Sequence, residues 1–347
     1  MVPADLHPRP SALGPDTAGA APGFPAPSVS PALPPKGRFA PSPSGRMHLG
    51  NALCALLAWL FARSQGGTIV LRTEDLDPQR CRMEYALQIE EDFRWLGLDW
   101  DEGGSQAGKA TAYFQSRRAG FYESCLALLR EKAEIYPCFC TRAELHAAQA
   151  PHASDGRFLY SGRCYRLSGE ERKALLKARN PALRIHVPEE KVFFQDGLLG
   201  LCGEDLAAEC GDFILRRSDG VFAYQLACAC DDGAMGVTQV VRGRDLLSST
   251  PQQMYLLRLL GYPPPRYYHI PLLLSPDGIR LSKRDKALDL GELRRGYSPR
   301  ELIGLLAFLC GLLPQPEPAS PQELLSVFDP ANIKREDIRL PASLYEG

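Results

Sequence analysis

Apolar residues recur at spacings of three and four along several stretches of the chain, which is the pattern of helices that bury one face. The pattern is clearest after residue 48, where one face collects Leu49, Leu53, Leu56, Leu57, Leu60 and Phe61. The same reasoning predicts helices over residues 48–64, 84–96, 115–132, 245–260 and 299–313, with a short helix after the proline-rich break at 314–321.

Short runs rich in valine, isoleucine and phenylalanine, bounded by turn residues, predict strands. One ends at Gly37–Ala40 just before the first helix, and Thr68–Asp77 forms a buried strand that ends in acids. From Pro181 onward four more runs predict strands: ALRIHV, KVFFQD, DFILRRSDGVFAYQLAC and GVTQVVRG. In the third run, Ser218–Gly220 makes a hairpin turn and Tyr224 lies on the returning strand. Strands that precede helices indicate an open α/β sheet, in which ligands sit at the carboxyl ends of strands.

Composition places the chain among ordinary globular proteins. Its 347 residues allow two domains and a sizeable core, and 45% hydrophobic and 23% charged residues are usual for such proteins. The net charge of −1 gives no overall attraction for nucleic acid, so any RNA contact must be local. We find no apolar run long enough to cross a bilayer.

Residues 1–36 differ from the rest of the chain, because they are rich in proline and alanine and show no periodicity. They predict a disordered leader. A secretory signal needs a basic start and a continuous apolar stretch, and both are missing, so we expect a cytoplasmic protein. Its eleven cysteines should then be reduced thiols or metal ligands. Cys228 and Cys230 fit small apolar residues of a buried strand.

The stretch RFAPSPSGRMHLGN, Arg38 to Asn51, combines a strand, a turn and a helix start. Pro41 and Pro43 keep the helix from beginning early. The open helix N-terminus presents unpaired N–H groups that suit a phosphate, and Gly50 lets a ligand approach the backbone. His48 is placed to donate to a phosphate oxygen. The alternative is a solvated loop before an ordinary helix.

A second stretch, IRLSKRDKA, covers Ile279 to Ala287 and follows a hairpin-like turn at Pro276–Gly278. It carries several cations within a few residues, and Lys283 lies in its centre. Fixed cations of this kind neutralise charge that grows on phosphates during phosphoryl transfer. The alternative for Lys283 is one more solvated charge in a basic run.

Two further residues lie where they suit an amino-acid ligand. Glu74 lies at the carboxyl end of a predicted strand, where it suits an ammonium group, or it is a salt-bridged or capping acid. Arg242 ends another predicted strand, and a guanidinium there suits bidentate capture of a carboxylate. From the residues alone, Arg242 fits a surface ion pair better and Tyr224 fits a core aromatic better.

A group of cysteines has metal-ligand spacing. Cys138 and Cys140 form a C-x-C pair, and Cys164 supplies a third thiolate from a distant turn, which leaves one corner of a tetrahedral site open. The candidates for that corner are His146, His152 and Tyr160. On chemistry alone a histidine is the better choice, and the alternative to a metal site is a cluster of reduced thiols.

The two stretches together resemble the paired signatures of class I aminoacyl-tRNA synthetases, in the order and spacing of the glutamyl branch. Two positions depart from the class: Asn51 stands where histidine is common, and Arg280 replaces a leading lysine. The pattern C-x-C followed by Y-x-x-x-C resembles the zinc site of a glutamyl synthetase paralogue. That resemblance implies a structural Zn²⁺ held by Cys138, Cys140, Tyr160 and Cys164.

The resemblance implies an α/β fold: a Rossmann-type parallel-sheet catalytic domain with an inserted zinc-binding, mixed α+β acceptor-type subdomain. After the leader at 1–36, we expect catalytic halves at 37–136 and 211–298, the insertion at 137–210 and a C-terminal helical segment at 299–347. A full glutamyl-tRNA synthetase continues with an anticodon-binding domain, which is expected to be missing here.

With both signatures, the cysteine–tyrosine cluster and the early stop, the chain looks like a member of the glutamyl-queuosine tRNA(Asp) synthetases. That family activates L-glutamate with ATP and Mg²⁺ and esterifies it onto queuosine in the anticodon loop of tRNA(Asp). The implied glutamate-binding residues are Arg38, Phe39, Ala40, Pro41, Ser42, Glu74, Tyr224 and Arg242. The implied ATP-binding residues are His48, Gly50, Asn51 and Lys283, of which His48 and Lys283 are catalytic. We expect a monomer.

Three other functions remain open. The nearest is a truncated glutamyl-tRNA synthetase that charges the 3′ end of a tRNA, since both enzymes share the adenylate chemistry. A catalytically silent module that binds RNA or a protein is a second, although Glu74, Arg242 and Lys283 argue against it. The third is an adenylate-forming ligase that acts on a small molecule.

Overall fold

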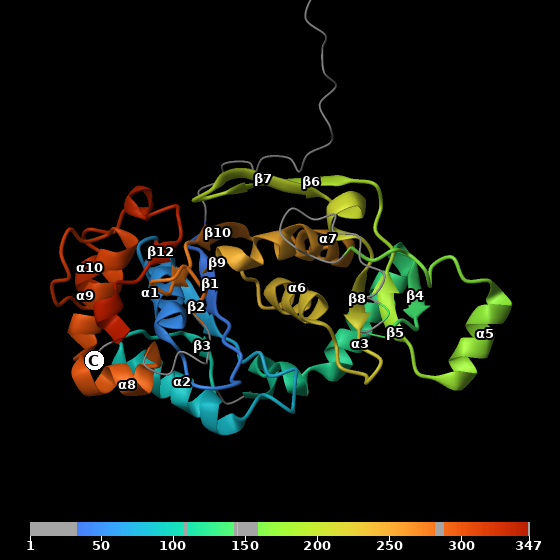
Figure 1. The fold of residues 1–347 in the computed structure, drawn as a ribbon, viewed down its shortest axis with the longest axis horizontal. Coiled ribbons are helices and arrows are strands. Elements are labelled where there is room, and N and C mark those ends of the chain that lie inside the picture. The colour runs from blue at the N-terminus through green and yellow to red at the C-terminus, as the bar shows by residue number, and fades with distance from the viewer. Residues whose placement is uncertain (1–32, 107–109, 142–143, 145–158, 282–287, 346–347) are drawn as a thin grey trace, which may run out of the picture.

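The computed structural model describes residues 33–106, 110–141, 144, 159–281 and 288–345. The molecule is elongated, with α9 (Pro299–Cys310) and α10 (Pro321–Leu324) at one end of its long axis (Figure 1). At the other end lies α5 (Gly169–Ala178), which buries none of its residues. The parallel strands lie between these two ends, nearer to α9.

Two sheets lie side by side and supply the framework of the site. The first has the order β1-β2-β3 and is parallel, and the second has the order β7-β6-β10-β9, in which β6, β10 and β9 are parallel. The strands are β1 (Lys36–Phe39), β2 (Thr68–Leu71), β3 (Glu102–Gly103), β6 (Lys191–Asp196), β7 (Gly200–Asp205), β9 (Gln239–Gly243) and β10 (Arg266–Ile270). Strand β1 lies next to β9, because the Thr238 amide donates to the Lys36 carbonyl at 2.9 Å. The parallel α/β framework expected from the sequence is confirmed.

Helix α1 (Leu49–Arg63) follows β1 and forms the centre of the main core. Eleven of its 15 residues are buried, so it is apolar almost all round, as a helix enclosed on every side must be. It packs against β1 and β9 on one side and against α9 and α10 on another. Helix α2 (Met83–Trp95) adds Ile89 and Phe93 to the same core.

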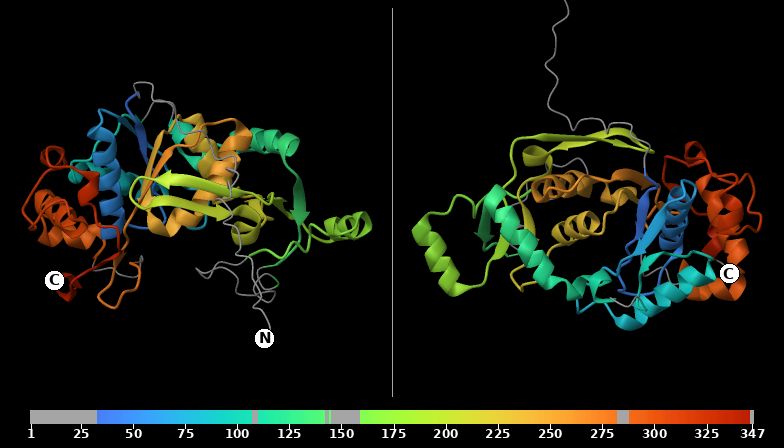
Figure 2. Two further views of the ribbon diagram at one scale, coloured as in Figure 1. Left: turned by 90° about the horizontal axis from the view of Figure 1, so that it is seen from above. Right: turned by 180° about the vertical axis from the view of Figure 1, so that it is seen from behind.

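A second region extends away from these sheets toward α5 (Figure 2). Here β4 (Ile135–Cys138), β5 (Ala182–Ile185) and β8 (Phe213–Arg216) form an antiparallel sheet. Helix α3 (Ala119–Lys132) leads into it. Strand β5 lies within the expected insertion at 137–210, whereas β4 crosses its start and β8 follows its end. The expected domain boundaries stay a prediction.

The predicted strand that carried Tyr224 and the pair Cys228 and Cys230 is wrong. The hairpin around Gly220 is short, with Arg216 bridging Phe222, and Tyr224 begins α6 (Tyr224–Ala234). A continuous apolar run does not distinguish a buried strand from a buried helix by periodicity. The run LACACDD is buried on all sides, so no polar face marks its helical period.

Other predicted boundaries shift by a few residues. The second strand ends at Leu71, and the predicted helix at 245–260 divides into a 3₁₀ turn (Arg244–Ser249) and α7 (Thr250–Leu260), where Pro251 marks the α-helical start. The remaining elements are α8 (Leu290–Gly296), the pair β11 (Leu273–Leu274) and β12 (Ile338–Arg339), and short turns of helix at Ala110–Tyr113, Gln115–Arg117, Leu206–Cys210, Pro330–Asn332 and Ala342–Tyr345. Within the described residues, no helix has both the length and the apolarity to cross a bilayer.

Candidate active site

A cavity of about 810 Å³ opens where β1 and β9 end. Strand β1 pairs with β2 on one side and lies against β9 on the other. The connections that leave β1 and β9 therefore lead to opposite sides of this point. Open α/β sheets bind ligands at such switch points. The cavity is lined by every predicted glutamate and ATP residue within the described part of the chain: Arg38, Phe39, Ala40, Pro41, Ser42, His48, Gly50, Asn51, Glu74, Tyr224 and Arg242.

The start of α1 at this cavity is held by a reciprocal cap. His48 Nδ1 accepts from the Gly50 amide at 3.1 Å, and Asn51 Oδ1 accepts from the His48 amide at 3.1 Å. Because Nδ1 accepts a hydrogen bond, Nε2 carries the proton of the neutral imidazole and is a donor. Gly50 has a packing reason as well, since a Cβ there would lie 3.1 Å from the His48 ring.

The first signature turn is joined to the helix that follows the second signature. The Leu290 amide donates to the Met47 carbonyl at 2.8 Å. Asp92, which is fully buried on α2, accepts from Arg294 at 2.9 Å and lies 3.8 Å from Arg46. Lys283 lies outside the described residues, as does all of 282–287.

Buried ion pairs hold two residues of the cavity wall, Glu74 and Arg38. Arg72 is fully buried, and its Nη1 donates to Asp232 Oδ1 at 2.6 Å while Nη2 donates to Glu74 Oε1 at 2.9 Å. Arg38 Nε lies 3.7 Å from the same Asp232 oxygen. Burial raises the pKa of Glu74 despite Arg72. Burial also acts to raise the pKa of Asp232, but the Arg72 and Arg38 guanidiniums outweigh it and hold that pKa below its ordinary value.

Arg242 is buried, with 3% of its surface exposed, and so is not the surface ion pair that the residues alone favoured. Nη1 donates to Gln253 Oε1 at 2.7 Å, Nη2 to Thr250 Oγ1 at 2.7 Å, and Nε to His269 Nε2 at 3.1 Å. None of these acceptors is a carboxylate, and no carboxylate oxygen of the described residues lies within 4.0 Å of Arg242. A buried cation in this state suits an anionic ligand.

Tyr224 is half-buried at the first turn of α6 and lines the cavity, so it is not a core aromatic. Sequence reasoning missed the buried pair of Arg72 and Asp232, and it also missed His269. Arg72 lies directly after β2 and His269 on β10, at the carboxyl ends of parallel strands. That position was the signal by which sequence analysis could have found them.

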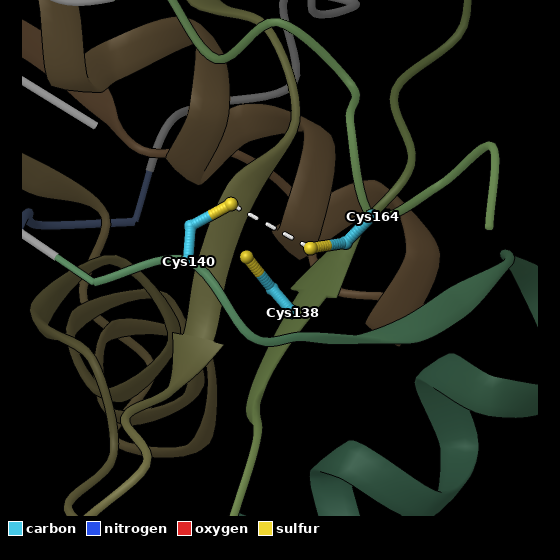
Figure 3. Close-up of side chains that lie close together, drawn as sticks. All are labelled: Cys138, Cys140 and Cys164. Atoms are coloured by element: carbon cyan, nitrogen blue, oxygen red, sulfur yellow. Dashed lines mark hydrogen bonds between the residues drawn. The ribbon is translucent and has the colours of Figure 1, made fainter. Parts of the chain in front are cut away.

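The three predicted cysteine ligands converge away from this cavity (Figure 3). The sulfurs of Cys138, Cys140 and Cys164 lie within 4.8 Å of one another, and Cys140 and Cys164 are 3.5 Å apart. The Tyr160 hydroxyl lies 3.6 Å from Cys138 Sγ and 3.7 Å from Cys140 Sγ. The rival ligands His146 and His152 lie outside the described residues.

Residues 36–324 match the family described as tRNA synthetases class I (E and Q), catalytic domain. The match covers most of the chain, which therefore belongs to this family of ligases.

Several of the similar curated proteins carry a narrower name. A Glutamyl-Q tRNA(Asp) synthetase of Symbiobacterium thermophilum is 51% identical over 88% of this chain and 96% of that protein. One of Nitratidesulfovibrio vulgaris is 48% identical over 90% of this chain and 97% of that protein. A Glutamate--tRNA ligase 2 of Alkalilimnicola ehrlichii is 45% identical, and the match spans 58% of its length.

Solved structures agree on the fold. A glutamate tRNA ligase from Elizabethkingia meningosepticum, in complex with its amino acid, superposes with a TM-score of 0.76 at 28% identity. The match covers 90% of this chain and 68% of that one. The class I synthetase fold expected from the signatures is thus confirmed.

Proposed function

We propose that this chain activates L-glutamate with ATP and transfers the glutamyl group to queuosine in the anticodon loop of tRNA(Asp). The observation that carries the proposal is the buried guanidinium of Arg242, which no described carboxylate neutralises, in one cavity with Glu74. The names of the similar proteins from Symbiobacterium and Nitratidesulfovibrio support the choice of acceptor. The monomeric state and the cytoplasmic location expected from the sequence stay predictions.

The charges of the cavity match the charges of glutamate. Glutamate carries two carboxylates and one ammonium group, and the wall offers the guanidiniums of Arg242 and Arg38 together with the carboxylate of Glu74. Guanidinium groups bind carboxylates through paired N–H donors. Tyr224 adds a hydroxyl to the same wall, and the segment Phe39–Ser42 adds backbone groups.

The start of α1 provides the ATP site of this proposal. The positive end of the helix dipole and the protonated Nε2 of His48 suit phosphate oxygens, and Gly50 keeps the backbone accessible. The glutamate carboxylate attacks the α-phosphate of Mg²⁺-bound ATP in line, and pyrophosphate leaves. A hydroxyl of queuosine then attacks the carbonyl of the adenylate, and AMP leaves. Lys283 neutralises the charge that grows on the phosphates, and positioning supplies most of the remaining rate.

We also propose a structural zinc ion bound by Cys138, Cys140, Cys164 and Tyr160. The three sulfurs approach one another as the ligands of one ion do, and the Tyr160 hydroxyl lies beside two of them. Four protein ligands close a structural site. A bound ion would supply no step of the reaction, and its ligands would tie the end of β4 to the loop that carries Tyr160 and Cys164.

A transfer assay with labelled glutamate tests the proposal. Labelled ester should form on tRNA(Asp) that carries queuosine and not on tRNA(Asp) without queuosine or on tRNA(Glu). Charging of tRNA(Glu) at its 3′ end would instead establish the rival glutamyl-tRNA synthetase activity. Glu74→Gln should abolish most of the transfer. The control is Glu102→Gln, which changes an acid on β3 that pairs with Lys36 outside the cavity, and it should leave the transfer nearly unchanged.

A further inference from the structure

Three adjacent parallel strands each place one polar side chain in a line behind the cavity. The residues are Asp196 at the end of β6, His269 on β10 and Arg242 on β9, and His269 lies directly opposite Arg242 in the strand register. All three are buried, with exposed fractions of 1%, 1% and 3%. Arg242 lines the cavity, whereas the described residues Asp196 and His269 are not part of its wall.

The donor and the acceptor of each hydrogen bond among Arg242, His269 and Asp196 are fixed by chemistry. A guanidinium only donates, so His269 Nε2 accepts from Arg242 Nε at 3.1 Å. The proton of the neutral ring is therefore on Nδ1, which donates to Asp196 Oδ2 at 2.7 Å. The Leu198 and Leu199 amides fix the other oxygen, Oδ1, at 2.9 Å each. Asp196 thus sets the tautomer that presents a lone pair to Arg242.

The environment keeps this imidazole neutral. Burial lowers the pKa of His269, and the Arg242 cation lowers it further, against the effect of the hydrogen bond to Asp196. The other groups that accept hydrogen bonds from Arg242, Thr250 and Gln253 on α7, are neutral as well. A carboxylate in place of any of these partners would neutralise the guanidinium before a ligand arrived.

We propose that His269, oriented by Asp196, is a positioning residue that holds the Arg242 guanidinium in place without neutralising it, so that its full charge binds the glutamate carboxylate. The inference rests on the proposed function, because it concerns the binding of glutamate at that site. In this role His269 and Asp196 control the affinity for glutamate, although neither residue contacts glutamate or ATP.

Two substitutions at one position separate this role from a structural one. His269→Gln keeps an acceptor near the place of Nε2 and so keeps the bond to Arg242. His269→Asn keeps a donor near the place of Nδ1 and so keeps the bond to Asp196 but not the bond to Arg242. The Asn variant should raise the KM for glutamate in pyrophosphate exchange on the order of 10- to 100-fold. The Gln variant should raise it severalfold at most, and the KM for ATP should change little in both.

A merely structural role predicts the opposite order, because only His269→Asn keeps Asp196 paired. Equal KM values for glutamate in the two variants, or a higher value in the Gln variant, would overturn the inference. Calorimetric titration with L-glutamate alone gives the same ranking as Kd values without any catalysis. Wild-type protein that binds glutamate but makes no adenylate would refute the proposed activity, while the ranking of Kd values would still decide the role of His269.

A measurement on the unaltered protein covers the case in which a variant does not fold. The chain has six histidines, and ¹⁵N labelling of their rings distinguishes the two neutral tautomers and the imidazolium by nitrogen NMR. The signal of His269 is assigned either as the one that a folded variant loses or through its buried Nδ1 proton. It should show a proton on Nδ1 alone between pH 6 and pH 8. A proton on Nε2 in that range would contradict the proposed geometry.

Discussion

Arg72 shows how strongly one residue can depend on partners that are distant in sequence. Its guanidinium lies between Glu74, two residues away, and Asp232, 160 residues away, and none of its surface is exposed. Removing one partner of a buried ion pair leaves an uncompensated charge, which typically costs about 3–5 kcal/mol. Without Arg72, the Glu74 carboxylate would lose its ion-pair partner, and Asp232 would keep only Arg38, at 3.7 Å.

Arg72→Met should therefore lower the free energy of unfolding by about 3–5 kcal/mol, measured by urea denaturation monitored by circular dichroism. Arg295→Met is the matched control, because Arg295 pairs with Glu292 on the surface with 77% of its side chain exposed. The control should change stability by no more than about 0.5 kcal/mol. Similar effects of the two substitutions would show that the buried cluster is not what stabilises this part of the sheet.

Lys283 carries the residue-scale prediction for the chemical step. If it stabilises the transition state, Lys283→Ala should lower kcat and kcat/KM of adenylate formation together, on the order of 10² or more, with glutamate affinity nearly unchanged. Arg284→Ala and Lys286→Ala are the controls from the same basic run. These two should mainly weaken RNA binding and its dependence on salt. A small, salt-sensitive effect shared by all three variants would make Lys283 one solvated charge among several.

The site residues that sequence analysis found and missed differ in a physical way. The resemblance pointed to Arg38, Glu74 and Arg242, because short segments with recognisable neighbours carry them. His269 and Asp196 were missed, since they are 73 residues apart and meet only because β6 and β10 are adjacent in the sheet. No local pattern encodes a pairing of strands so far apart.

The start of α1 carries the first prediction at the scale of elements. Asn51→Ala removes the acceptor for the His48 amide and half of the capping box, which should lower stability by about 1 kcal/mol. Asn51→Asp keeps an acceptor oxygen and should restore most of that loss. Urea denaturation without ligands measures both, with the exposed Asn180→Ala as control. Equal stability of the Ala and Asp variants would mean that the cap contributes little.

The cysteine cluster carries the second prediction at this scale. Cys164→Ser should clearly lower the zinc content of the purified protein, since a thiolate ligand is lost, and Tyr160→Phe should lower it less, because water can fill that corner. Cys202→Ser is the matched control, because Cys202 lies on β7 outside the cluster. Metal analysis of all three decides the matter. An unchanged zinc content in Cys164→Ser and Tyr160→Phe would show that the cluster is a group of reduced thiols and not a metal site.

Sequence patterns predicted elements better where one face of the element meets solvent. Helix α2 was placed within one residue of its true limits, because polar residues separate its apolar positions at helical spacing. Helix α6 was taken for a strand, because seven consecutive residues, 226–232, are buried and leave no polar face to reveal a period. Burial on all sides, which suits α6 to the core, thus removed the signal.

At the scale of the whole molecule, the cavity is already assembled without RNA. Arg242 is held by Gln253, Thr250 and His269, and Glu74 is held by Arg72. The protein alone should therefore catalyse glutamate-dependent exchange of pyrophosphate into ATP, because the groups that bind glutamate need no further ordering. Exchange that begins only after tRNA is added would show that RNA completes the site.

The neighbouring positions of β1 and β9 have a consequence for the synthesis of the chain. The contact between Arg38 and Val241 closes a loop of 203 residues, which costs about 5 kcal/mol of chain entropy. On a ribosome that adds 5–20 residues per second, β1 waits roughly 10–40 s for β9 to emerge. During that time one edge of β1 has no partner strand, and such edges invite pairing with other chains. Charged side chains on an edge strand oppose such pairing, and Lys36 and Arg38 place two cations on this four-residue strand.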